Sequence, residues 1–193
     1  MFFRRKPKGP SKKYVAYLNK MAKYRLVMSR FAEEPGRQLL IYYFDQTKKE
    51  IYHMAAALNI SLKNPGELTS ENDLICCSAF DLSNHQFPVL SKVVSMEVHP
   101  LLSHTQLIEQ KFADPKMQLE FHVGFDEAAL SVFAMERVTN MMSRLGMSEN
   151  EPIEHAMISK SIENALEKLE EKLGSNHQDI RSSQEDWLAA NKL

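Results

Sequence analysis

Cysteine is almost absent from this chain of 193 residues: the only two, Cys76 and Cys77, are neighbours. Adjacent side chains of a strand point to opposite faces of the sheet, so a disulfide between these two would be strained. We therefore expect two reduced thiols in the core of a cytosolic protein. Metal binding by this pair alone is not expected either, because no further cysteine supplies the ligand spacing of a zinc site.

The sequence also lacks a long hydrophobic run. Its apolar runs are far shorter than the roughly 20 residues that cross a bilayer. The first six residues carry charge, but no apolar segment follows them, which is unlike a signal peptide. An excess of one charge is missing too: the formal net charge is −1, so no overall field favours nucleic acid. These absences predict a cytoplasmic protein.

Charge is nevertheless uneven along the chain. Residues 1–32 contain lysine and arginine but no acidic residue, whereas the segment from Glu149 onward is rich in acid. Residues 1–13 also contain two prolines and a glycine, which predicts a basic flexible arm. Aromatic side chains beside basic ones suit contact with an anionic membrane surface or a partner, and the alternative, a solubilising tail, stays open. In this arm they are Phe2, Phe3, Arg4, Arg5 and Lys6.

Short apolar runs alternate with amphipathic segments over residues 14–126. The runs are typical of strands buried on both faces, and the segments between them have helical spacing. We therefore predict a three-layer α/β domain with a mostly parallel sheet. The predicted strands are residues 38–44, 74–80, 93–98 and 118–123, and the predicted helices are residues 14–34, a helix that Asp45 caps and that runs to Leu58, and residues 103–112.

From Asp126 onward the pattern becomes helical. One helix is predicted over residues 126–145 and another through residues 158–173, and residues 148–151 have the form of a capping box. We divide the chain into an arm at residues 1–13, an α/β domain at 14–147 and a C-terminal helical extension at 148–193.

The most specific pattern lies between Asp126 and Lys172. The chain reads RVTNMM at residues 137–142, LGM at 145–147, EPIEH at 151–155 and IENA at 162–165. These spacings agree without a gap with the segments R-V-x-x-M-M, L-G-M, E-x-I-E-H and I-E-N-A of the SecA family. The chain thus resembles the second RecA-like motor domain of SecA-type preprotein translocase ATPases, with the start of the helical scaffold that follows it. The signature positions, which we expect to be structural, are Leu145, Gly146, Ile153, Glu154, His155 and Asn164.

Upstream, the predicted strands occupy the places of family strands in the same order. Residues 36–41 are similar to G-Q-P-V-L-V, and residues 94–99 are similar to the strand ending V-I-G-T-E-R-H. Residues 74–78 and 118–123 take the places of V-T-I-A-T and R-F-Y-L-S-L. With Asp179-Ile180-Arg181, which resembles D-I-R-K, the resemblance covers roughly residues 20–181. It also implies that His155 caps or orients the last helices.

The two motifs with which the family contacts nucleotide are missing. The place of M-A-G-R-G-T-D is taken by FDLSN at residues 80–84, and that of Q-L-R-G-R-x-G-R-Q-G-D by residues 106–114, where no arginine occurs. Lys111 does not replace an arginine finger, which presents a rigid, delocalised charge to the phosphoryl group. No G-x-x-x-x-G-K-[ST] phosphate loop is present either. We expect a degenerate RecA-like domain that is not an enzyme and holds no cofactor.

Glu97, His99 and His104 are close in sequence but fit no zinc-ligand spacing, so we expect His99 to be structural. The resemblance implies a non-catalytic SecA-like module, a binding or regulatory protein linked to preprotein translocation. Its partner would be a translocase component or an exported protein, in the cytoplasm or at the inner face of the membrane. Two alternatives stay open. One is a nucleotide-binding half-site completed by a partner ATPase chain; the other is nucleic-acid binding by the arm, although no nucleic-acid partner is expected.

Overall fold

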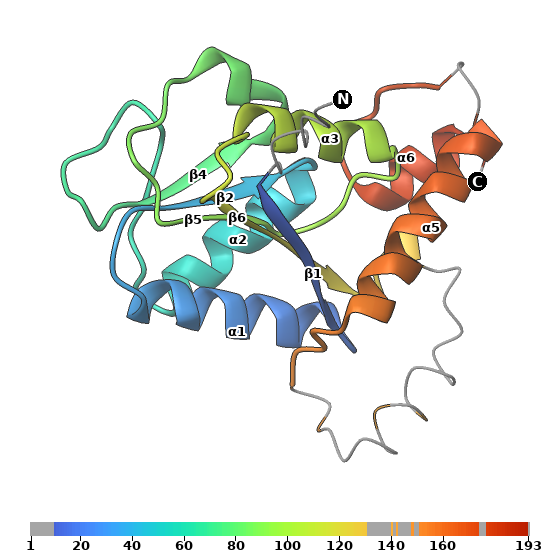
Figure 1. The fold of residues 1–193 in the computed structure, drawn as a ribbon, viewed down its shortest axis with the longest axis horizontal. Helices are drawn as coiled ribbons and strands as arrows, with labels where there is room; N and C mark the ends of the chain where they lie inside the picture. The colour runs from blue at the N-terminus through green and yellow to red at the C-terminus, as the bar shows by residue number, and fades with distance from the viewer. Residues whose placement is uncertain are drawn as a thin grey trace, which may run out of the picture.

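A six-stranded sheet with the order β1-β6-β5-β2-β4-β3 forms the centre of the computed structural model (Figure 1). The structure describes residues 10–130, 140, 142, 148, 151–173 and 177–192. The strands are β1 Ser11–Tyr17, β2 Gln38–Tyr42, β3 Leu62–Lys63, β4 Leu74–Ser78, β5 Lys92–Ser95 and β6 Gln118–Gly124. The helices are α1 Lys20–Glu33, α2 Asp45–Ala57, α3 Leu102–Lys111, α5 Ala156–Leu173 and α6 Gln184–Ala190, with 3-10 turns η1 Ala79–Asn84 and η2 Ala128–Leu130.

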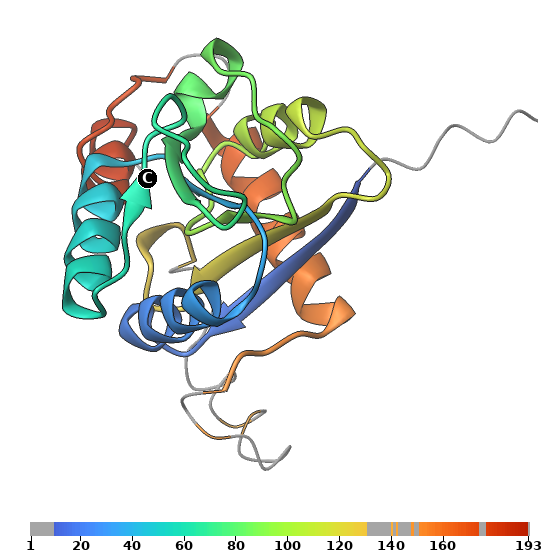
Figure 2. The same cartoon turned by 90° about the vertical axis from the view of Figure 1, so that its left-hand side faces the viewer.

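Helices cover both faces of this sheet. Figure 2 shows α1 and α2 on one side of the strands and α3 and α5 on the other. Two core clusters correspond to these two faces: one joins the sheet to α1 and α2, and the other joins it to α3, α5 and α6. Every pairing between the strands is parallel. The predicted three-layer α/β class with a parallel sheet is therefore confirmed.

The two cysteines lie in the middle of β4, on opposite faces as predicted. Cys76 belongs to the cluster under α1 and α2, and Cys77 belongs to the cluster on the other face. Both are free thiols and both are buried. Burial raises the pKa of Cys76 to about 12 and that of Cys77 to about 11. Both therefore stay protonated at neutral pH, in keeping with core residues.

The start of the chain departs most from the predicted elements. Residues 11–17 form β1, although residues 1–13 were predicted as an arm and residues 14–34 as one helix. β1 runs parallel to β6 over its whole length, and its alternate side chains enter the two core clusters. The helix begins only after Asn19, whose side-chain oxygen accepts the N–H of Ala22 at 2.8 Å. A cap at this position ends the strand and fixes the first turn of α1.

The segment before α5 also differs from the prediction. In the predicted capping box, the N–H of Ser148 donates to the Glu151 carboxylate at 3.0 Å, but the helix starts later, at Ala156. Between them Ile153 forms an antiparallel bridge with Ala16 of β1. The chain therefore first pairs with the edge of the sheet and only then turns into the helix.

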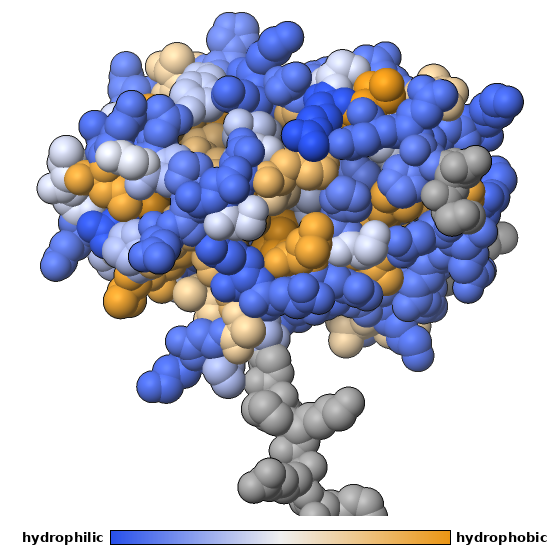
Figure 3. Space-filling view, turned by 90° about the horizontal axis from the view of Figure 1, so that it is seen from above, coloured by the Kyte–Doolittle hydropathy of each residue, from blue (hydrophilic) through white to orange (hydrophobic). Residues whose placement is uncertain are grey.

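The surface over α3 is mainly hydrophilic, with apolar side chains gathered in small patches (Figure 3). Leu107 of α3 is 55% exposed, and Val89, in the loop before β5, is 91% exposed. In the part of the chain that the structure describes, no helix combines the length and the apolar character that crossing a membrane requires.

Candidate functional site

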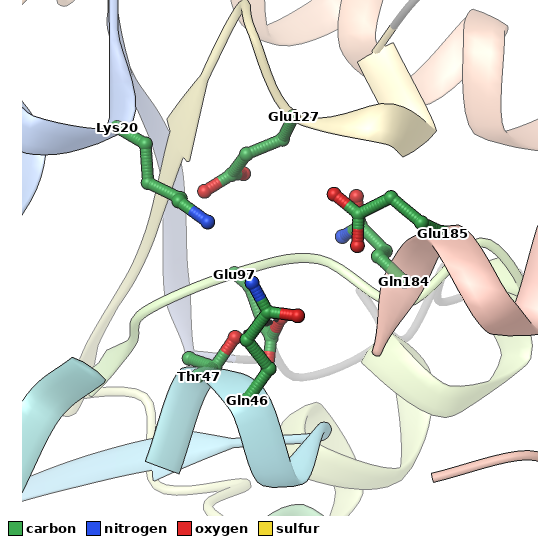
Figure 4. A pocket seen from close by; sticks show the side chains of 7 residues that line it. All are labelled: Lys20, Gln46, Thr47, Glu97, Glu127, Gln184 and Glu185. Carbon is green, nitrogen blue, oxygen red and sulfur yellow. Dashed lines mark hydrogen bonds between the residues drawn. The ribbon is translucent and has the colours of Figure 1, made fainter. Parts of the chain in front are cut away.

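Side chains from five segments meet at the carboxyl ends of the strands (Figure 4). Ligands of open parallel sheets bind outside this edge, so it is the first place to look for a site. The space enclosed is about 20 Å³, enough for about one water molecule. Its lining residues are Lys20, Gln46, Thr47, Glu97, Glu127, Gln184 and Glu185.

Glu97, which follows β5, holds the start of α2. Its Oε1 accepts the backbone N–H groups of Tyr43 at 2.8 Å and Phe44 at 3.0 Å, and its Oε2 accepts the hydroxyl of Thr47 at 2.7 Å. The N-cap of α2 is Phe44; Asp45, which the sequence suggested as the cap, is instead the first helical residue. Burial raises the pKa of Glu97 to about 7, against the opposing effect of these hydrogen bonds.

A buried ion pair lies beside this carboxylate. The Lys23 ammonium of α1 pairs with the Glu127 carboxylate, which follows β6, and also donates to the carbonyl of Met96. Lys23 has no exposed surface, and Glu127 is 7% exposed. Burial raises the pKa of Glu127 in spite of its lysine partner. Because removing charges from water is costly, such a pair is stable only when both members are present.

The C-terminal segment supplies hydrogen-bond acceptors for the backbone N–H groups at the start of α2. The N–H of Asp45 donates to the carbonyl of Arg181 at 2.8 Å, and the N–H of Gln46 donates to that of Ser182 at 3.0 Å. The first N–H groups of a helix have no partner within the helix and commonly bind anions. Here they already bind carbonyl oxygens of the same chain.

α6 continues this contact across the carboxyl edge. The side chain of Gln184 accepts the N–H of Ala129 at 2.8 Å and donates to the carbonyl of Val98 at 2.9 Å. Trp187, one turn later, is fully buried. The carboxyl edge is therefore closed by side chains and main chain from residues 181–187.

His99 lies under α6 in a cluster of rings. Its imidazole stacks on Phe44 with 5.4 Å between ring centroids, and lies 4.1 Å from His104 and 5.1 Å from Trp187. Its Nδ1 accepts the N–H of Leu101 at 3.1 Å, and burial lowers its pKa to about 2. His99 is thus a neutral core residue, as the sequence predicts. Nowhere in the described ranges do three or more His, Cys, Asp or Glu side chains gather in a way that could hold a metal ion.

The segments that replace the nucleotide-contacting motifs have other structural roles. Residues 80–84 belong to η1, which follows β4. Lys111, the cation nearest to the missing arginines in sequence, ends α3 and donates to the carbonyl of His85 at 2.8 Å. Its ammonium also lies 5.8 Å from the ring centroid of Phe87. Neither segment contributes a side chain to the cavity at the carboxyl edge.

The signature residues of the family lie away from this edge. Glu154 pairs with Lys13 of β1 at 3.1 Å, and the Nδ1 of His155 accepts the N–H of Met157 in the first turn of α5 at 3.2 Å. Both line a groove between β1 and α5, together with the exposed Asn164. The remaining predicted residues lie outside the described part of the chain: Phe2, Phe3, Arg4, Arg5, Lys6, Leu145 and Gly146.

Sequence reasoning missed Gln184 and Trp187, which close the edge. A signal was present: Ser183 precedes them and caps α6 by accepting the N–H of Asp186 at 3.0 Å, which is the usual spacing of a helix start. Trp187 is also the only tryptophan of the chain.

Comparison with known proteins gives this fold a family context. No protein-family model matches the chain. It is 42% identical over 67 residues to the protein translocase subunit SecA of Legionella pneumophila (strain Corby), a match of 35% of this chain and 7% of that protein. It is 48% identical over 50 residues to SecA of Desulfotalea psychrophila (strain LSv54 / DSM 12343), a match of 26% of this chain and 6% of that protein. Part of the chain is homologous to SecA. Since the match spans less than a tenth of either SecA, it shows similarity to one region of SecA and no activity of the whole translocase subunit.

Solved structures of lower similarity also match. The C-terminal domain of the DEAD-box protein Dbp5 has a TM-score of 0.46 and 12% identity, and covers 69% of this chain and 87% of its own. The C-terminal part of the Fun30 ATPase domain has a TM-score of 0.40 and 9% identity, with 82% and 53% covered. The parallel six-stranded sheet agrees with the RecA-like fold that the resemblance to SecA predicts.

Proposed function

We propose that this chain is a non-catalytic, SecA-like module that binds or regulates a protein of preprotein translocation. The link to translocation comes from the homology to SecA. A translocase component or an exported protein would be its partner, in the cytoplasm or at the inner face of the membrane. The missing nucleotide motifs and the carboxyl edge of the sheet support the lack of catalysis.

The observation that carries the proposal is the occupied start of α2. A phosphate bound there would need the N–H groups of residues 43–46. The Glu97 carboxylate takes two of them, and the carbonyls of Arg181 and Ser182 take two more. A nucleotide would have to displace all of these groups together, at the cost of buried polar atoms without partners.

The charges at this edge also disfavour a bound nucleotide. Glu97, Glu127 and Glu185 face the cavity, and only Lys20 among its lining residues is basic. Lys20 is itself paired with Glu50 at 2.8 Å. Carboxylates in a site of low dielectric repel phosphate oxygens strongly, so this edge is unsuited to a nucleotide.

Calorimetry with magnesium-ATP and magnesium-ADP on the full chain tests the lack of a nucleotide site, with SecA as the positive control. We expect neither heat nor thermal stabilisation. A ligand at 100 times its Kd would stabilise the fold by about 2.7 kcal/mol, which a thermal melt detects readily. Micromolar binding would overturn this part of the proposal. Affinity capture with purified translocase components and an exported precursor tests the other part, and no retention of any of them would contradict it.

One observation favours the alternative of a half-site completed by a partner ATPase. The side chain of Arg181 is 52% exposed beside the carboxyl edge, and its guanidinium carbon lies 4.0 Å from the ring centroid of Phe80. An arginine there can serve a phosphate that another chain holds, although Asp179 already pairs with it at 3.1 Å. This alternative predicts that the chain stimulates ATP turnover by its partner and that Arg181→Lys abolishes the stimulation.

A further inference from the structure

The C-terminal segment contacts the sheet in the way that a bound peptide contacts a receptor. Within residues 177–192 the buried side chains are those of Ser183, Gln184 and Trp187. Two residues before them, Arg181 and Ser182, contribute backbone carbonyls and have exposed side chains. An extended lead followed by anchors at i and i+3 of a short helix is a recurring mode of peptide recognition.

The receptor side of this contact is formed by elements far away in sequence. It consists of the α2 donors at Asp45 and Gln46, the carbonyl of Val98, the N–H of Ala129 and the ring slot around His99. Most of these groups are main-chain atoms that the fold holds in place. They bind the backbone of a short segment, one amide side chain and one aromatic ring.

We infer that the carboxyl edge of the sheet is a docking site for a helical segment of a partner protein, and that residues 181–187 are its resident ligand. The segment it accepts carries a glutamine followed three residues later by tryptophan, after an extended stretch with two free carbonyls. The inference rests on the proposed function only in that it requires a protein partner.

The buried donors favour replacement of the resident segment by another segment over its release with nothing in its place. If residues 181–187 left, the N–H groups of Asp45 and Gln46 and the polar groups that bind Gln184 would lose their partners. Buried main-chain groups without partners are costly, so the edge is refilled by a segment with the same pattern. A partner therefore competes with the resident segment.

A peptide of residues 178–192 that carries Trp187→Phe tests this on the full chain. Because Trp187 is the chain's only tryptophan, its fluorescence reports the resident segment alone. We expect a saturable red shift of the emission as the peptide displaces the resident helix. A second peptide that also carries Gln184→Leu loses both amide hydrogen bonds and should bind at least about tenfold more weakly. Its matched control, Ala189→Gln, changes an exposed residue of the same helix and should bind like the parent peptide.

If the resident segment is bound too tightly for the peptide to displace it, the full chain with Gln184→Leu provides the test. Its resident segment lacks both amide hydrogen bonds, so this chain should bind the parent peptide about tenfold more tightly than the native chain does. The inference is overturned if neither chain shows the shift, or if the Gln184→Leu peptide binds as well as its parent. This outcome is independent of the proposed function, whose failure would appear as absent capture of translocase components with the peptide exchange intact.

Discussion

Replacing Glu97 by glutamine should change how the stability of the fold depends on pH. The pKa of this buried carboxyl is raised from 4.5 to about 7, and burial is the main cause. In the unfolded chain the same group ionises near its ordinary value. Between these two values the folded protein therefore holds a proton that the unfolded chain has lost, and stability falls as pH rises. Above about 7 the stabilisation that this proton provides is gone.

The magnitude follows from the two values. The difference between 4.5 and about 7 corresponds to about 3 kcal/mol, taken as an order of magnitude. Glutamine keeps an oxygen for the N–H groups of Tyr43 and Phe44 but does not ionise. The free energy of unfolding of the native chain, minus that of Glu97→Gln, should therefore fall by about 3 kcal/mol between pH 4.5 and pH 7.

Urea unfolding of both proteins over this pH range, followed by circular dichroism and Trp187 fluorescence, measures the difference. Subtraction removes the titration of groups that the two proteins share. Thr47→Val is the second variant: its hydroxyl donates to the Glu97 carboxylate and favours the charged form, so its loss should move the step to higher pH. A difference between native and Glu97→Gln chains that is independent of pH would refute the reasoning.

Three further outcomes are expected. Lys23→Met leaves the buried Glu127 carboxylate without its partner and should cost about 3–5 kcal/mol in urea unfolding, most of which Glu127→Leu in the same chain should restore. Asn19→Ala removes the side-chain cap of α1 and should cost about 1 kcal/mol in the same assay, whereas Asn19→Asp should cost little. Because burial raises the pKa of Cys76 and Cys77, a disulfide reagent at pH 8 should modify neither thiol until urea unfolds the chain; rapid modification of the native protein would contradict the buried geometry.

The central strands could be predicted because their local sequence pattern identifies them without knowledge of the strands with which they pair. Residues 38–42 and 74–78 are mainly apolar, residues 118–124 alternate polar and apolar side chains, and all three segments are strands of the sheet. β1 was missed because Tyr14, Leu18 and Met21 are also spaced as on a helix. Met21 is 66% exposed, so the stripe that this spacing suggested does not exist. The strand is fixed instead by its pairing with β6, which lies about a hundred residues away in sequence.

The site could not be predicted for a related reason. Gln184 bonds to Val98 across 86 positions, and the Asp45 N–H bonds to Arg181 across an even longer span. No local pattern marks such pairs. The family resemblance gave no indication that the segment after Asp179 turns back over the sheet.

At the carboxyl edge of this domain, groups of the same chain supply the acceptors that the N-terminal end of α2 favours. The positive end of the α2 dipole favours a negative group, and in a phosphate-binding protein the ligand provides it. Here an oxygen of the Glu97 carboxyl accepts the first N–H groups, and the two carbonyls of residues 181–182 complete the set of acceptors. An incoming anion gains little at a helix end whose charge and hydrogen bonds are already matched. A peptide segment, by contrast, can replace the carbonyls and the Gln184 amide one for one while Glu97 stays in place. The same arrangement that disfavours nucleotide therefore favours exchange with another polypeptide.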